Sequence, residues 1–166
     1  MASIQPYKID VPQAKLDRLK QKLVLADLPD EPAGVEPWTR GVPLQEMKRL
    51  HEYWRDQYDW RKAEAHLNKF PQFTAEIEVQ DFGLYKVHFV HQKSENKNAI
   101  PLLFMHGWPS SFMEGTKILP ELVKGGSDFP AFHFVAPSLM DYAFSDPTKK
   151  VSSKSSFFQR RNHLLI

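Results

Sequence analysis

The sequence predicts an α/β protein, in which a helical N-terminal segment precedes the first strands of a sheet. In the first 70 residues, apolar side chains recur every three or four positions, the spacing of a helix buried on one face. From residue 74 the spacing changes to two. Two apolar runs, 100–105 and 132–136, then flank a helical stretch, which predicts a right-handed parallel βαβ unit. A chain of 166 residues is long enough for one domain with its own core.

Three helices are expected in the N-terminal segment. The first follows Asp10 as its N-cap and Pro12 as a first-turn proline, and residues 28–43 after it are irregular because of their prolines and glycines. The second begins at Leu44, and a shorter third helix covers residues 61–68. The apolar faces of the first two helices are formed by Leu16, Leu19, Leu23 and Ala26, and by Leu44, Met47, Leu50, Trp54 and Tyr58.

The strands are predicted from alternation and from turns. Residues 74–79 and 84–90 alternate around the turn at 81–83, which predicts an antiparallel hairpin. The wholly apolar run 100–105 is typical of a buried parallel strand. A helix over 112–124 is expected after the capping box Ser111-x-x-Glu114, with Gly125-Gly126 ending it before the strand at 132–136.

Composition excludes several classes of protein. The net charge of +2 is too small to indicate binding to nucleic acid or to an anionic membrane. The absence of cysteine excludes disulfides and thiolate chemistry. No signal peptide and no apolar window of membrane-spanning length are visible, so we expect a soluble, cytoplasmic protein. Residues 149–166 contain five basic side chains and no acidic one, which sets them apart as a divergent, disordered tail.

The strongest functional signal is His106-Gly107-Trp108-Pro109, which directly follows the apolar run 100–105. A strand, a tight turn and a helix start place backbone N–H groups at the carboxyl edge of a sheet, as an oxyanion hole requires. We expect the Trp108 N–H to serve there, with a packing role for its side chain as the alternative. His106 is expected to orient the loop by hydrogen bonding rather than to act as a general base. A cis peptide bond before Pro109 is compatible with the turn.

Other chemistry-bearing residues have less support. Asp141 follows the strand 132–136, but Met140 and Tyr142 are too large for the strained turn of a nucleophile elbow, and no G-x-S-x-G or G-x-D-x-G occurs. A catalytic pairing of Asp141 with His133 or His163 has no supporting pattern. His88 and His91 are three apart on a strand and therefore on opposite faces, which disfavours a metal site. The aromatic residues between 38 and 60 are interpreted as core packing rather than as a ligand cage.

The sequence resembles the N-terminal part of the microsomal-type epoxide hydrolases, which belong to the α/β-hydrolases. The more specific stretches are Tyr53-Trp54-Arg55, with Tyr58-Asp59-Trp60-Arg61 after it, and Phe70-Pro71-Gln72-Phe73. The resemblance runs from Pro6 to Pro147 and also includes Pro6-Tyr7-Lys8-Ile9, Gly41-Val42-Pro43-Leu44, Leu67-Asn68-Lys69, His106-Gly107-Trp108-Pro109 and Ala136-Pro137-Ser138-Leu139.

This resemblance implies an α/β-hydrolase core, here with an incomplete sheet, and hydrolysis of an epoxide to a vicinal diol. It implies a nucleophilic Asp that forms an ester, a His with an acidic partner that activates water, and two lid tyrosines. Only the oxyanion-hole loop, residues 106–109, maps onto this sequence. The remaining groups belong to positions beyond residue 148, so we expect a chain cut before its nucleophile. No cofactor or metal is implied.

Two departures from the family accompany the match. Where relatives read P-G-Y-G-F-S, this chain has Met140-Asp141-Tyr142-Ala143-Phe144-Ser145, and loss of both glycines stiffens a loop at the active-site edge. The tail indicates a frameshift, a retained intron or an alternative transcript end. We therefore expect an N-terminal helical segment over 1–73, a partial hydrolase core over 74–148 and a tail over 149–166. The chain is interpreted as an inactive enzyme fragment. The alternative is a non-catalytic protein that associates, through its exposed sheet edge, with a full-length relative or with a missing C-terminal half.

Overall fold

The computed structural model describes residues 3–149, which fall into two compact units. One unit combines the residues up to Lys8 with the chain from Phe70 onward, and the other is Ile9–Lys69. The expected boundaries at residues 73 and 148 stay predictions. The tail lies outside the described residues, apart from Lys149.

The unit Ile9–Lys69 contains helices α1 (Gln13–Val24), α2 (Leu44–Asp56) and α3 (Trp60–Leu67). Three helices were expected, but Asp10 as the first N-cap is wrong, because that position is occupied by Pro12 without a side-chain hydrogen bond. The physical reason is that the residue before a proline avoids helical geometry, so α1 begins only after Pro12. Helix α3 has a side-chain cap, since the Asp59 carboxylate accepts hydrogen bonds from the backbone N–H groups of Arg61 and Lys62.

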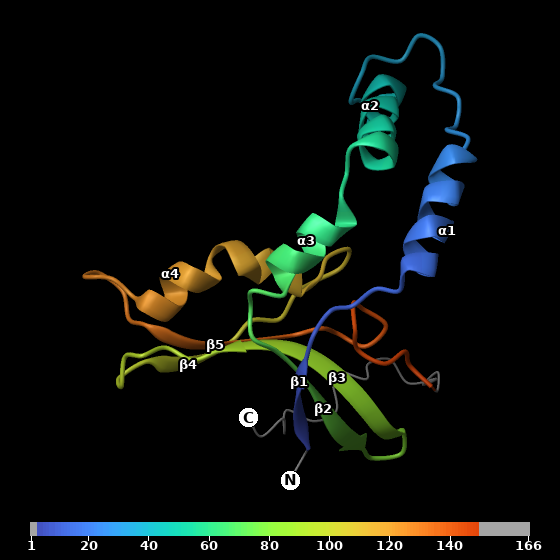
Figure 1. Ribbon diagram of the computed structural model, residues 1–166. Helices are drawn as coiled ribbons and strands as arrows, with labels where there is room; N and C mark the ends of the chain where they lie inside the picture. Colours follow the sequence, from blue (N-terminus) through green and yellow to red (C-terminus); the bar gives the residue numbers. More distant parts are fainter. Residues whose placement is uncertain (1–2, 150–166) are drawn as a thin grey trace. The chain divides into compact units, whose positions relative to one another are not determined.

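The other unit is built on a five-stranded sheet in the order β1-β2-β3-β5-β4 (Figure 1). The strands are β1 (Ile4–Tyr7), β2 (Gln72–Val79), β3 (Gly83–Gln92), β4 (Ile100–Leu103) and β5 (Phe132–Pro137). All neighbours are antiparallel except β4 and β5, which are parallel. The predicted hairpin and the predicted parallel pair are both confirmed. Strand β1 was missed, because four residues with a proline carry too little alternation to be recognised.

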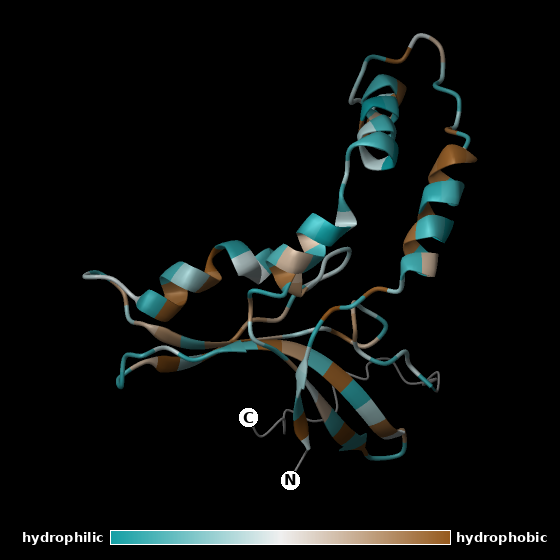
Figure 2. Ribbon diagram, viewed as in Figure 1, coloured by the Kyte–Doolittle hydropathy of each residue, from teal (hydrophilic) through white to brown (hydrophobic). Residues whose placement is uncertain are grey.

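Figure 2 shows hydrophilic and hydrophobic residues alternating along β2 and β3, as expected of strands with one buried face. The core of this unit includes Tyr85 and Val90 from β3 and Phe134 and Ala136 from β5. The prediction that the run 100–105 is buried is wrong, since Ile100 and Leu103 are 48% and 45% exposed. Strand β4 pairs with β5 alone among the described residues, and it therefore forms an edge of the sheet.

The stretch after the His106–Pro109 loop is not one continuous helix. It divides into a 3₁₀ helix, η1 (Phe112–Lys117), and a short α-helix, α4 (Leu119–Lys124), which lies along one face of the sheet (Figure 1). Pro120 accounts for the break, because a proline cannot donate to the preceding turn and is accommodated only at the start of a helix. Within residues 3–149, no helix is long and apolar enough to cross a membrane.

Candidate functional site

The loop that follows β4 makes a tight turn at the carboxyl end of this strand. The peptide bond between Trp108 and Pro109 is cis, and the Ser110 N–H donates to the Gly107 carbonyl at 3.1 Å, which closes a type VI turn. The Trp108 side chain is 83% exposed, so the packing role considered for it is not present in the described part of the chain. The Trp108 N–H donates to no described residue. Within residues 3–149, the Trp108 N–H therefore remains available in this turn as a backbone donor.

The His106 side chain holds the loop against the segment that follows β5. The ring is buried, its Nδ1–H donates to the Gly107 carbonyl at 3.0 Å, and its Nε2 accepts from the Leu139 N–H at 3.1 Å. The ring of Tyr142 packs edge-on against it, with 5.2 Å between the ring centroids. Both ring nitrogens of a neutral imidazole are thereby engaged. This arrangement orients the loop and leaves no nitrogen free for general-base chemistry.

The start of η1 supplies only part of the expected capping box. The Ser111 Oγ accepts from the Met113 N–H at 3.3 Å, and the Glu114 N–H donates to the Ser111 carbonyl. In the described region, the Ser111 N–H donates no hydrogen bond to the Glu114 carboxylate. Phe112 is buried beside this turn. The helix start therefore anchors the loop through one serine cap and one aromatic side chain.

The Asp141 carboxylate is held by hydrogen bonds within its own loop, which is a structural role rather than that of a nucleophile. Its carboxylate accepts from the Thr148 N–H at 2.8 Å and from the Thr148 Oγ1 at 2.7 Å. These hydrogen bonds, led by the one from the threonine hydroxyl, lower the pKa of Asp141. Of the two histidines considered as its partner, His133 accepts from the Ser94 N–H through Nδ1, and His163 lies outside the described residues. Asp141 thus closes the loop 141–148 on itself.

His88 and His91 lie on opposite faces of β3, as expected from their spacing. His88 is fully buried between the Ser138 Oγ, at 2.8 Å, and the Gln72 Oε1, at 2.9 Å. Burial lowers the pKa of His88 to about 4. Partial burial also lowers the pKa of His91, with smaller effects from the nearby Lys93 and His133. Among residues 3–149, no three acidic or histidine side chains are grouped as a metal ion would require.

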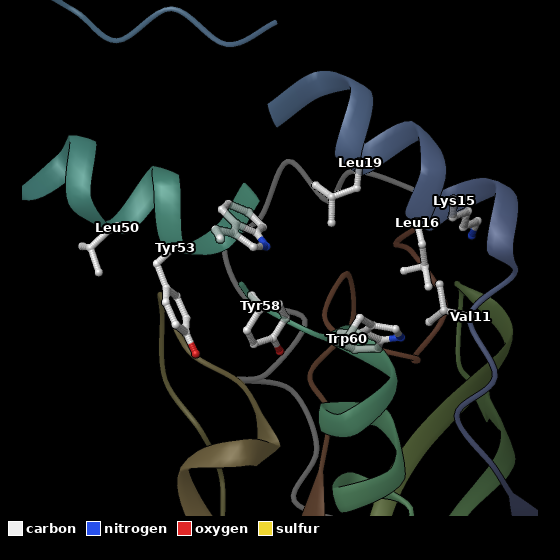
Figure 3. Close-up of a pocket in the computed structure, with 9 residues that line it drawn as sticks. Val11, Lys15, Leu16, Leu19, Leu50, Tyr53, Tyr58 and Trp60 are labelled. Carbon is white, nitrogen blue, oxygen red and sulfur yellow. The ribbon is translucent and has the colours of Figure 1, made fainter. Parts of the chain in front are cut away.

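Four aromatic residues of the other unit line an open groove, namely Tyr53, Trp54, Tyr58 and Trp60. The prediction of core packing is wrong for them, since Tyr53 and Trp54 are each 48% exposed and α2 has no buried residue. In Figure 3, Leu16 and Leu19 of α1 point toward the space bordered by Tyr58 and Trp60. The groove has a volume of about 660 Å³ and is lined by Val11, Lys15, Leu16, Leu19, Leu50, Tyr53, Trp54, Tyr58 and Trp60.

Sequence reasoning missed the partners of the loop. Ser138 and Leu139 were noted for their resemblance only, and His88 only as an unsuitable metal ligand. Yet the Leu139 N–H donates to His106, and the Ser138 hydroxyl is hydrogen-bonded to His88. Leu139 is 33 residues from His106 in the sequence, and Ser138 is 50 residues from His88. No local sequence pattern indicates that these residues meet.

A family model and two curated relatives that match this chain are all described as epoxide hydrolases. Residues 4–115 match the family described as "Epoxide hydrolase N terminus". A putative epoxide hydrolase of Stigmatella aurantiaca is 45% identical over 89% of this chain and 33% of its own length, and juvenile hormone epoxide hydrolase 1 of Ctenocephalides felis is 38% identical over 89% and 32%.

The solved structures that match have the α/β-hydrolase fold. Epoxide hydrolase of Aspergillus niger has a TM-score of 0.73 at 33% identity, with 89% of this chain and 38% of that chain covered. Juvenile hormone epoxide hydrolase of the silkworm Bombyx mori has a TM-score of 0.77 at 25% identity, with coverages of 90% and 39%. The chain spans about a third of the length of the curated relatives it matches.

Proposed function

The chain belongs to the epoxide hydrolase family, and on that premise we propose that residues 106–109 supply an oxyanion-hole donor for hydrolysis of an epoxide to a vicinal diol. The supporting observation is the Trp108 N–H, which has no acceptor among the described residues and lies in a turn at the carboxyl end of β4. An oxyanion hole needs such a preorganised donor, because its dipole then costs no reorganisation when charge develops.

The proposed reaction has two steps. A carboxylate attacks one epoxide carbon, the C–O bond of the ring breaks, and the released oxygen takes up a proton, which leaves a hydroxyl beside an ester. Water, deprotonated by a histidine, then attacks the ester carbonyl. The negative charge that develops on the carbonyl oxygen is the charge that the Trp108 N–H would stabilise. When the ester C–O bond breaks, the leaving alkoxide takes the proton from the histidine, and the diol leaves.

These 166 residues are proposed to form no diol by themselves. The family resemblance assigns the nucleophilic carboxylate, its histidine and acid, and the lid tyrosines to positions beyond residue 148. Asp141, the acidic residue nearest to the end of β5, has both carboxylate oxygens engaged by Thr148. The oxyanion-hole donor alone gives only a small part of an enzyme's rate enhancement.

The test is complementation with a matched pair of substitutions. The purified chain is mixed with the C-terminal two thirds of the Stigmatella relative, and diol formation from styrene oxide is measured. We expect no turnover by the chain alone and turnover by the mixture. Trp108→Pro, which removes the N–H, is expected to lower turnover about 100-fold or more, whereas Trp108→Ala, which keeps the N–H, lowers it little. Diol formation by the chain alone, or equal losses in both variants, would contradict the proposal.

A second candidate function is non-catalytic association through the sheet edge. It is supported by β4, whose outer edge has no partner among the described residues and whose Ile100 and Leu103 are half-exposed. Unpaired, apolar strand edges pair readily with other chains. Analytical ultracentrifugation at concentrations on the order of 1–100 µM measures whether the mass of the sedimenting species rises with concentration, as association requires. If the chain stays monomeric over this whole range, and Leu103→Lys does not alter its sedimentation, the association is contradicted.

A further inference from the structure

His88 occupies the most enclosed polar position of the sheet unit. Its side chain is fully buried in β3, yet each ring nitrogen has one partner. The Nε2–H donates to the Gln72 Oε1 at 2.9 Å, and Nδ1 accepts from the Ser138 hydroxyl at 2.8 Å. A neutral imidazole has one donor and one acceptor, and both are used here.

The backbone of His88 also holds Ser138. The Ser138 N–H donates to the His88 carbonyl at 2.8 Å, while the His88 N–H donates to the Ser145 Oγ at 3.0 Å. The Ser145 hydroxyl in turn donates to the Ser138 carbonyl at 2.8 Å. Ser138 is therefore fixed through its amide, its carbonyl and its hydroxyl, and all three connections lead directly or through Ser145 to His88.

Ser138 is joined to the candidate site by the next residue. The Leu139 N–H donates to His106 Nε2, and His106 Nδ1–H donates to the carbonyl of Gly107, the residue before Trp108. A second route runs through Phe112, whose ring packs edge-on against the His88 ring with 5.0 Å between centroids. Phe112 opens η1 just after the loop, so contacts with His88 reach both sides of the turn.

We infer that His88 is a positioning residue, which sets the direction of the Trp108 N–H through Ser138, Leu139 and His106. This inference rests on the proposed oxyanion-hole function of that N–H. Rigid support is effective in such a site because misplacement of a donor by about 1 Å is costly to catalysis. A neutral, hydrogen-bonded ring also fixes the orientation of Ser138 better than an apolar side chain would, since hydrogen bonds are directional.

The test uses ¹⁵N NMR of the full chain, with the ring nitrogens of His106 and the Trp108 amide as readouts. Ser138→Ala removes only the hydroxyl bonded to His88, and His88→Phe keeps a flat aromatic ring while it removes both hydrogen bonds. Val90→Ala is the matched control, because Val90 is equally buried in β3 but is outside this hydrogen-bonded series.

In the wild type we expect the His106 proton on Nδ1. In Ser138→Ala and His88→Phe, the His106 signals are expected to shift toward a mixture of tautomers, and the Leu139 amide to exchange about five- to tenfold faster than in Val90→Ala. Unchanged His106 signals in folded Ser138→Ala, or the same shift in Val90→Ala, would overturn the inference. Ser138→Ala decides if His88→Phe does not fold. None of these readouts requires turnover, so they are independent of the complementation result.

Discussion

Asp141 and Ala143 both have left-handed backbone geometry, with φ of 69° and 48°. They are the two positions at which the epoxide hydrolase resemblance has glycine. The loop thus keeps a conformation that suits glycine, although neither residue is one. Asp tolerates this conformation better than most residues, and its carboxylate is held by Thr148, whereas Ala143 has no such compensation in its own side chain.

Ala143→Gly is therefore expected to stabilise the chain by up to about 1 kcal/mol, because relief of the left-handed strain exceeds the entropy gained by the unfolded state. Urea unfolding followed by circular dichroism measures this difference. Ala136→Gly, at a buried position near the end of β5, is the control and is expected to destabilise the chain. Destabilisation by both variants would show that the Ala143 backbone is not strained.

His88 should make stability depend on pH. The pKa of His88 is about 4 in the folded state and 6.5 ordinarily. Between these pH values the unfolded state therefore binds a proton that the folded state does not bind. Stability is then fully present above pH 6.5 and falls as the pH decreases toward 4, by about 3 kcal/mol in total. NMR titration of the His88 Cε1–H tests this directly. A midpoint above pH 6 would contradict the expectation.

At the scale of elements, Glu64 connects helix α3 to the start of α1. Its carboxylate accepts from the Val11 N–H at 2.7 Å, from the Arg61 guanidinium at 2.6 Å and from the Trp60 indole at 3.1 Å. The backbone N–H of Val11 is the largest cause of the lowered pKa of Glu64, followed by Arg61. The Asn68 side chain adds two hydrogen bonds to the backbone of Ile9, so the two ends of this unit are joined by side chains of α3 and its cap.

Glu64→Gln is expected to weaken this connection and to flatten its dependence on pH. Because the pKa of Glu64 is lower when folded than its ordinary 4.5, the folded state binds fewer protons. The wild type should therefore lose helical signal as the pH falls below about 4.5, and the variant should lose less over the same range. Glu52→Gln is a control on α2, because the Glu52 carboxylate accepts no hydrogen bond from another described residue. Parallel acid transitions in all three proteins would exclude a special role for Glu64.

Across the whole molecule, patterns local in sequence were predictable and contacts between distant residues were not. The hairpin β2–β3 follows from alternation around a turn at Gly83, and the His106–Pro109 loop was recognised with its cis bond as an option. The break at Pro120 was missed because apolar spacing continues across it. Sequence periodicity indicates which side chains share a face, but not which segment covers that face. The exposure of β4 and of the aromatic groove could therefore not be predicted.

Burial is distributed unevenly between the two units, and this predicts where the chain opens first. Among residues 3–149, ten of the buried apolar side chains belong to the sheet unit, and only Ile9, Leu23 and Leu67 belong to the helical one. Helix α2 has none. Because local opening is resisted mainly by buried apolar contacts, amides of α2 are expected to exchange at least about 100-fold faster than those in the middle of β3. Hydrogen exchange read by mass spectrometry measures both segments in one experiment. Equal protection would mean that the exposed groove on α1 and α2 is covered in solution, and the same experiment at increasing protein concentration would identify a second copy of the chain as the cover.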